Sequence, residues 1–570
     1  MKHLSNTSLA LGFLFCVLLS CNGKTTGPAQ ALIDGMNLKR GTVISCGDPN
    51  KKFGELNFDM SCDGKVKADF NLAIELLHSF EYDEAEKMFA KVIDVAPDCA
   101  MAYWGVAMSN FHPLWSPPTQ SELIKGSKAV AIANGIGKIP TREAAYINAI
   151  GAYYNNWDKT VHRNRCLNFE KAMEQLHLNY PDDKEAAIFY ALALDAAAEP
   201  TDKTFAKQIK AGKILTALYP AEPGHPGIVH YIIHTYDYPG LAQLGLDAAR
   251  KYASVAPSSA HALHMPSHIF TRLGLWDECI TSNTGSVTAA KCYGEAAGTK
   301  GNWSEELHGL DYLVYAYLQK GDNVMAKKYI DYLNDINSVD PPDFKAAYAF
   351  AASPSRFVLE NKNWQQAATL PLYGANITWT KFPWQEAIIH FTRCIGATHI
   401  KDIAVANTEL AMLQQLHDTL QLQKDTYRAG LVAVQINTAK AWMALATVQP
   451  LAAVHLMKLA ADMEDSTEKS PVSPGEILPA RELLGDMLLQ LGQYQNALTA
   501  YEVALKKSPN RFNSLYGAGM AAQKLNETDK AKTYYQQLLT ITDATTNRPE
   551  IESARSFLAK GIVLNVPANK

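Results

Sequence analysis

The sequence lacks the short motifs that identify several large classes of enzyme. It contains no HExxH, which excludes a zincin-type hydrolase, and neither GxSxG nor a P-loop, which removes the commonest serine hydrolase and nucleotide-binding classes. No CxxC pair occurs among its nine cysteines, so a zinc site built on thiolates is disfavoured. Any chemistry must therefore come from another arrangement of side chains.

The sequence also lacks a basic stripe and clear strand patterns. Its formal net charge is -4, and it has none of the interleaving of aromatic and basic residues expected of a nucleic-acid groove, which argues against a nucleic-acid partner. No alternating apolar and polar run bounded by turn residues predicts a strand. With 47% hydrophobic and 19% charged residues, 570 residues can bury a large core but are too many for one compact globule. We therefore expect an all-α chain built from repeats.

The N-terminus has the pattern of a secretory signal. A basic start precedes an apolar run, Leu9 to Leu19, that is too short to be a stable membrane span. The run ends in Leu18-Leu19-Ser20-Cys21, which resembles a bacterial lipobox and implies removal of residues 1–20 and a lipid on the Cys21 thiol. This predicts a lipid-anchored protein of the bacterial cell envelope, at the outer membrane or the periplasmic face. The alternative is an ordinary signal peptide with a cysteine at its cleavage site.

An oxidising envelope makes disulfide bonds plausible. Cys46, Cys62 and Cys99 are the candidates because they lie near the start of the fold. The remaining cysteines of the mature chain are expected to be isolated, buried small residues: Cys166, Cys279, Cys292 and Cys394.

From residue 67 the sequence is typical of paired helices, with small residues where helices cross and proline where pairs end. The pattern predicts a tetratricopeptide-type helix-turn-helix α-solenoid, or superhelix. We divide the chain into a signal peptide (1–20), a tether and N-terminal segment (21–66), divergent repeats (67–463) and regular C-terminal repeats with a capping helix and tail (464–570).

Histidines are concentrated in one stretch, since six of the sixteen lie within residues 225–268. At about 100° per residue, a helix turns this spacing into shared faces. Two successive helices are expected to carry them: His230, His234 and Asp237 on the first, and His261, His264 and His268 on the second. The offset from His230 to His264 is 34 residues, the tetratricopeptide period, so the two faces should lie side by side.

These faces predict a site for a transition metal (zinc, copper or iron), because neutral imidazoles at i and i+4 can converge on one ion. The best ligands are expected to be His230, His234, His264 and His268, all on one ion, followed by Asp237, His261 and His308. His308 enters because an insertion after Cys292 brings it to the place equivalent to His264. Binding should weaken below about pH 6.5, where protons compete for imidazole. The alternative is a metal-free polar network or a ligand groove.

Three further residues are expected to line a groove beside the site: His225, Asp195 and Asp311. His225 precedes a proline at a helix start and either caps the helix or lines the mouth of the groove. Asp195 would supply an acid or base, unless it is only part of a solvated helix end before Pro200. Pro266 should loosen the second histidine helix.

The segments that carry these patterns resemble a group of bacterial envelope tetratricopeptide proteins and, more distantly, tetratricopeptide repeat protein 38. The resemblance rests on the HPG at 225–227, the HALHMPSHIF at 261–270, the DCAMAYWG at 98–105 and the PARE at 479–482. It implies the fold and leaves the activity open. Two functions remain as hypotheses: a metalloprotein, as an enzyme or a carrier of a small ligand, and a scaffold that binds a peptide, a protein partner or a glycan without metal.

Overall fold

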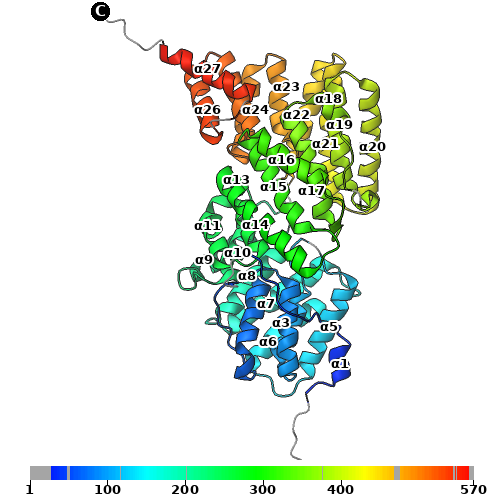
Figure 1. Cartoon of the computed structure of the whole chain (residues 1–570), viewed down its shortest axis with the longest axis vertical. Coiled ribbons are helices and arrows are strands. Elements are labelled where there is room, and N and C mark those ends of the chain that lie inside the picture. The colour runs from blue at the N-terminus through cyan, green and yellow to red at the C-terminus, as the bar shows by residue number, and fades with distance from the viewer. Residues whose placement is uncertain are drawn as a thin grey trace, which may run out of the picture.

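The computed structural model describes residues 27–47, 52–115, 117–199, 202–374, 376–467, 475–543, 546 and 548–563. The predicted signal peptide and Cys21 lie outside the described residues, so lipid attachment stays a prediction. Helices run from the blue N-terminal end of an elongated molecule to the red C-terminal end (Figure 1).

Consecutive helices of the first half pack against one another along the chain. Their bounds are α1 Gln30–Asp34, α2 Lys67–His78, α3 Tyr82–Val95, α4 Ala100–Ser109, α5 Gln120–Gly135, α6 Thr141–Tyr154, α7 His162–Asn179, α8 Lys184–Ala196, α9 Ala206–Leu218, α10 Pro226–Tyr236, α11 Leu246–Val255, α12 Ala260–His264, α13 Pro266–Leu273 and α14 Trp276–Ala297. Two short 3-10 helices, η1 Gly64–Val66 and η2 Ala242–Gly245, join them.

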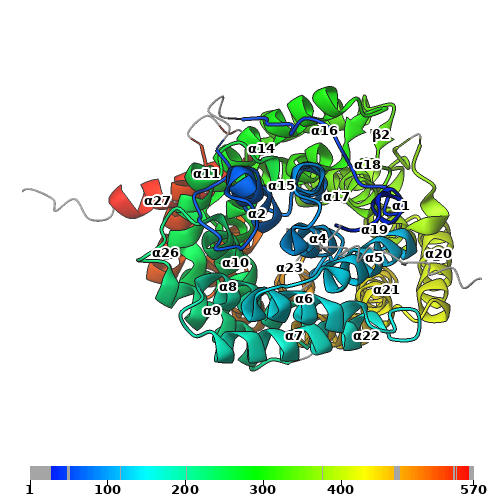
Figure 2. The same cartoon turned by 90° about the horizontal axis from the view of Figure 1, so that it is seen from below.

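The second half continues the same arrangement. Its helices are α15 Ser304–Gln319, α16 Asn323–Asn334, α17 Phe344–Glu360, α18 Trp364–Ala368, α19 Pro383–His399, α20 Ile403–Leu422, α21 Thr426–Ala446, α22 Pro450–Ser466, α23 Ala480–Gln490, α24 Tyr494–Lys507, α25 Phe512–Lys524, α26 Thr528–Ile541 and α27 Pro549–Val563, with η3 Trp379–Lys381. Seen along the long axis, the helices are arranged around a common centre (Figure 2).

Residue spacing explains why these segments form packed helices. In α3 the buried Ala85, Met88, Phe89 and Val92 recur at three- and four-residue spacing, which gives the helix one apolar face. Where α3 meets α4, Gly105 lets the backbones approach, because a Cβ there would lie 2.2 Å from the Phe89 ring. Repetition of such pairs produces the solenoid.

Two hydrophobic cores extend along the molecule. One gathers residues between Ile33 and Ala316, and the other residues between Tyr348 and Ala554. A smaller cluster gathers residues between Val287 and Ile377. The prediction of an all-α helix-turn-helix solenoid is confirmed, whereas the predicted domain boundaries stay a prediction.

Disulfides tie the N-terminal segment to the helices. Cys62 is bonded to Cys99, and both were among the three predicted candidates. Cys46, the third candidate, is bonded to Cys292. The prediction that Cys292 is an isolated buried residue was therefore wrong. The two bonded residues are 246 positions apart, so no local spacing revealed that α14 passes beside the N-terminal segment.

Two short irregularities shape the region of the histidines. β1 (Asn302–Trp303) and β2 (Val339–Asp340) pair in parallel and fix the starts of α15 and α17 near each other. Between α12 and α13 the helix is interrupted at Met265, immediately before Pro266, as predicted. In the part of the chain that the structure describes, no helix combines the length and apolar character needed to cross a membrane.

Candidate metal centre

Four helices carry the clustered histidines. α10 begins at Pro226, which suits the first helical position, and every residue of this helix is buried, including His230 and His234. α12 carries His261 and His264 on its five residues, and the remaining two ligand candidates lie on the next helices: His268 on α13 and His308 on α15.

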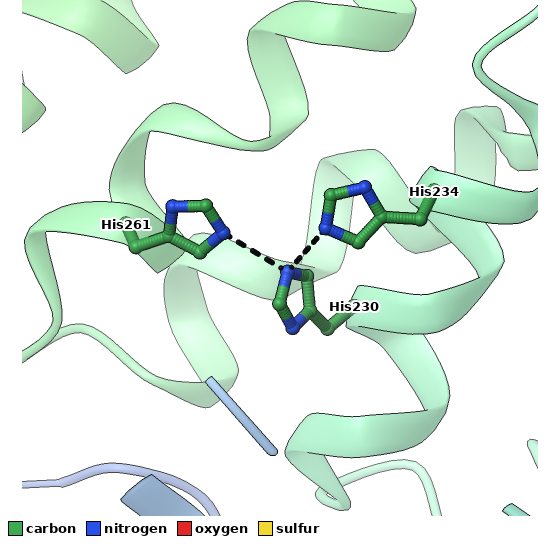
Figure 3. A group of neighbouring side chains, drawn as sticks. All are labelled: His230, His234 and His261. Atoms are coloured by element: carbon green, nitrogen blue, oxygen red, sulfur yellow. Dashed lines mark hydrogen bonds between the residues drawn. The ribbon is translucent and has the colours of Figure 1, made fainter. Parts of the chain in front are cut away.

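The first histidine group consists of His230, His234 and His261. The Nε2 atom of His230 lies 2.8 Å from Nε2 of His234 and 3.2 Å from Nε2 of His261 (Figure 3). One ring nitrogen from each residue falls within 4.8 Å of the others, so the three can reach a common ion.

The second histidine group consists of His264, His268 and His308. The Nε2 atoms of His264 and His268 are 3.1 Å apart, and the ring centroids of His264 and His308 are 4.4 Å apart. These three residues also offer ring nitrogens within 4.8 Å of one another. His308 therefore lies beside His264, the residue to which the insertion after Cys292 made it equivalent.

The imidazoles therefore divide into two groups of three, and the single four-histidine site expected from the sequence is corrected. The division already occurs within α12, before Met265. His261 joins the α10 histidines, whereas His264, on the same helix, groups with His268 of α13 and His308 of α15.

Hydrogen bonds orient three of the six rings from behind. His230 Nδ1 lies 2.6 Å from the backbone carbonyl of His78, His264 Nδ1 lies 2.7 Å from Asn283 Oδ1, and His268 Nδ1 lies 2.8 Å from Asp237 Oδ2. Metal-bound histidines almost always use their second nitrogen in this way, because the bond fixes both tautomer and orientation.

The tautomers of His264 and His268 follow from these partners. Asn283 donates its Nδ2 hydrogen to the carbonyl of Cys279, one turn earlier on α14, so its Oδ1 atom can only accept from His264. The Asp237 carboxylate likewise accepts from His268. In the neutral rings both Nε2 atoms are then unprotonated, and two lone pairs face each other across 3.1 Å. A cation between them would turn this repulsion into coordination.

Burial keeps the imidazoles in the form that binds metal. Loss of solvent and the neighbouring rings lower the pKa of His230, His234, His261 and His308 well below the ordinary value. Burial and His268 lower the pKa of His264 to about 3. Neutral imidazole is the ligand form, so these rings remain available under acidic conditions in which an exposed histidine is protonated.

Asp237 lies outside both histidine groups, although the sequence placed it among the ligands. Its carboxylate accepts a hydrogen bond from His268 and one of 2.8 Å from Nε of Arg272. Burial opposes ionisation, but Arg272 and His268 together lower the pKa of Asp237. Asp237 therefore holds the ring of His268 and is itself neutralised by an arginine.

Each of the three predicted groove residues contacts a side chain of another helix. His225 Nε2 lies 3.0 Å from Glu185, whose other oxygen contacts His78, and these three form a separate buried cluster. Asp195 accepts a bond of 2.5 Å from Thr235, and burial raises its pKa to about 8. Asp311 is paired with Arg356 at 2.5 Å. Asp195 and Asp311 lie in neither histidine group, because each is already bonded to a neighbouring helix.

A cavity of about 360 Å³ opens onto both histidine groups. His261 of the first group lines it together with His268 and His308 of the second. Four aromatic residues, Phe80, Tyr82, Trp115 and Phe344, also line it, and two of them touch the first group. Phe80 stacks on His234 with ring centroids 5.4 Å apart, and Trp115 meets the same ring edge-on at 4.7 Å.

Sequence reasoning missed several residues that complete the site. Asn283 and the His78 carbonyl orient rings, and Phe80 and Trp115 cover them, yet none belongs to a histidine-spaced motif. Phe80 has a positive φ of 57°, an uncommon conformation for a bulky residue. A lone asparagine or aromatic residue carries no signal in a single sequence, so only the fold reveals them.

Comparison with known proteins supports the repeat assignment at the C-terminal end. The tetratricopeptide repeat family matches residues 479–512 and 513–541. A search of curated proteins gives no match. Among solved structures, yeast Tom70 has 11% identity and a TM-score of 0.34, covering 88% of this chain and 97% of its own. The Cut9–Hcn1 hetero-tetramer of APC/C has 13% identity and a TM-score of 0.32, covering 88% and 90%. Similarity at this level says nothing about function.

Proposed function

We propose that this helical-repeat chain is a metalloprotein that binds one transition-metal ion in each histidine group. The observation that carries the proposal is the pair of Nε2 atoms on His264 and His268, which face each other at 3.1 Å in a buried place. When both rings are neutral these atoms are two acceptors, and burying them against each other is unfavourable unless a cation satisfies both. Burial opposes protonation of His264, and a proton would satisfy two rings only, whereas a metal ion can satisfy all three of a group.

The three imidazoles of each group limit which metal ions can bind and what chemistry a bound ion can perform. Imidazole suits zinc, copper and iron, and three protein ligands leave a further coordination position open, as in catalytic sites. A bound ion would act as a Lewis acid on a molecule in the adjoining cavity. We therefore propose a metal-dependent enzyme or carrier for a small ligand.

We further propose that the protein is held in the bacterial cell envelope by a lipid on Cys21. The lipobox-like tetrapeptide supports this anchor. Two disulfide bonds, Cys46–Cys292 and Cys62–Cys99, support an oxidising compartment. The anchor would hold the protein at the membrane without a spanning helix.

The second candidate function is a scaffold that binds a peptide, a protein partner or a glycan without metal. Repeat solenoids offer extended concave surfaces for such partners. A second, mainly apolar pocket favours it, formed by Tyr348 on α17, Trp384 and Phe391 on α19, and Leu431 on α21. It lies apart from both histidine groups, so the two functions are compatible in one chain.

Elemental analysis separates the two proposals. Protein reconstituted with zinc, copper or iron and then desalted should retain two ions per chain. His234→Ala should remove the ion of the first group and His268→Ala the ion of the second, each leaving the other ion in place. His417→Ala is the control, because His417 lies on α20 beside Asp418, away from the cluster. Wild-type protein that retains no metal, or histidine variants that retain the wild-type amount, would overturn the metal proposal.

A further inference from the structure

The two histidine groups are neighbours that share one opening. The ring centroids of His234 in the first group and His268 in the second are 6.5 Å apart. His261 and His264 belong to different groups yet lie on the same five-residue helix, α12. Residues of both groups also line the same cavity. Two ions bound here would present their open positions to one space.

The charge of such a pair would be poorly balanced by the protein. Six imidazoles that bind as neutral ligands contribute no negative charge, and Asp237 is already paired with Arg272. Glu305 and Asp343 line the cavity, but Lys345 is ion-paired with both, so these three residues supply only one net negative charge. Two divalent ions would leave a net positive charge in a buried place, which favours an anion from outside.

The residues that line the cavity indicate what kind of molecule the anionic group belongs to. Phe80, Tyr82, Trp115 and Phe344 surround the space with aromatic rings, and Leu114 adds an aliphatic face. A cavity of about 360 Å³ is far larger than an inorganic anion and is within the ordinary range for organic ligands. Aromatic rings prefer offset-stacked or edge-to-face contact with other aromatic rings.

We propose that the two groups form one dinuclear centre, and that the cavity binds a small aromatic anion whose ionised oxygens, a carboxylate or phenolate, bridge the two ions. This inference rests on the proposed metal binding. The aromatic body would lie against Phe344 and Trp115, with the anionic end toward His261 and His308.

The proposal is tested with copper(II)-loaded protein and three matched probes. Benzoate has the ring and the carboxylate, acetate only the carboxylate, and benzamide only the ring. Benzoate should bind once per pair of ions. Acetate should bind about tenfold or more weakly because it buries no ring. Benzamide should bind about tenfold or more weakly because it leaves the charge unbalanced. Benzoate should also diminish the electron paramagnetic resonance signal of isolated copper ions, since a bridged pair is magnetically coupled.

Two variants distinguish the cavity from the metal. Phe344→Ala should keep both ions and reduce benzoate affinity toward that of acetate, whereas Phe357→Ala, at a partly buried position outside the cavity, should change neither. His308→Ala, which should leave one ion, should lose tight benzoate binding. The dinuclear inference is overturned if two ions bind but benzoate matches acetate, if the signal of the isolated ions persists in the benzoate complex, or if His308→Ala binds benzoate as tightly. Failure to bind any ion would instead overturn the proposed function first.

Discussion

His264 and His268 face each other through Nε2 atoms 3.1 Å apart, and the Nδ1 atom of each ring is hydrogen-bonded to an oxygen on its other side. Asn283 fixes the first ring and Asp237 the second. These two hydrogen bonds orient His264 and His268 as metal ligands, and a cation can bind between their Nε2 atoms.

Replacing Asn283 should weaken metal binding although Asn283 is not a ligand. In Asn283→Leu, His264 loses the acceptor that fixes its tautomer, and affinity should fall by about 10–100-fold. Asn283→Asp keeps an oxygen acceptor and should bind metal more tightly than the leucine variant. Competition with a chromophoric chelator measures all three proteins.

Asn110→Leu is the matched control for this change. Asn110 is buried and also donates to a carbonyl one turn earlier, but its other bond is to Glu86 and not to a histidine. It should lower stability without changing metal affinity. Equal affinity in Asn283→Leu and wild type would show that the hydrogen bond to His264 has no part in binding.

Metal-free protein should lose stability as pH falls from about 6.5. The unfolded chain takes up protons on these histidines near that pH, whereas burial lowers the folded-state pKa of His234 and brings that of His264 to about 3. The unfolded state therefore binds more protons between about pH 6.5 and the folded-state values, so the free energy of unfolding decreases there. Each such histidine contributes up to about 1.4 kcal/mol per pH unit.

Denaturant unfolding at a series of pH values measures this slope. His264→Gln should make it shallower, and His417→Gln should not, because His417 is only partly buried. A slope unchanged by His264→Gln would mean that His264 titrates normally in the folded protein. Because the pKa values of these histidines are lowered, protons should compete with metal for the imidazoles only at a lower pH than the value of about 6.5 expected from the sequence.

Gly485→Ala should destabilise the C-terminal repeats. An added Cβ would lie 2.7 Å from the ring of Tyr501, on the neighbouring helix, and such overpacking costs about 1–3 kcal/mol. Gly430→Ala is the control, since nothing lies within 4 Å of its added Cβ in the interior of α21. It should stabilise by about 0.5–1 kcal/mol. Denaturant unfolding measures both variants. If the free energy of unfolding changes in the same direction in both, the contact between Gly485 of α23 and Tyr501 of α24 is contradicted.

Lipid attachment at Cys21 is tested by growth with a radioactive fatty acid. The wild-type protein should become labelled and Cys21→Ser should not, because the thiol is the predicted acceptor. Cys16→Ser, within the segment expected to be removed, should remain labelled. Label retained in Cys21→Ser would exclude the anchor.

The sequence was sufficient for the fold because helix periodicity and small residues at crossings are local signals. Positions such as Gly485 and Gly105 mark helix contacts that the structure contains. The histidines were found for the same reason, since i and i+4 spacing and the repeat period are visible in one sequence. His308 was found through the register of the insertion before it.

The division of the histidines and the surroundings of the site needed the structure. His261 and His264 lie on the same five-residue helix, so which neighbouring histidines each one meets depends on how α12 packs, which no local pattern reports. The pairing of Cys46 with Cys292 joins residues far apart in the chain. Asn283 acts through a single contact, so its role follows from position alone.

Anomalous X-ray scattering from crystals of the metal-loaded protein tests the central claim most directly. Data collected at the absorption edge of the bound metal should show two peaks. One should lie among the Nε2 atoms of His230, His234 and His261, and the other among the ring nitrogens of His264, His268 and His308. Absence of both peaks from protein soaked with zinc, copper and iron in turn, with His264 and His268 still in contact, would contradict the account.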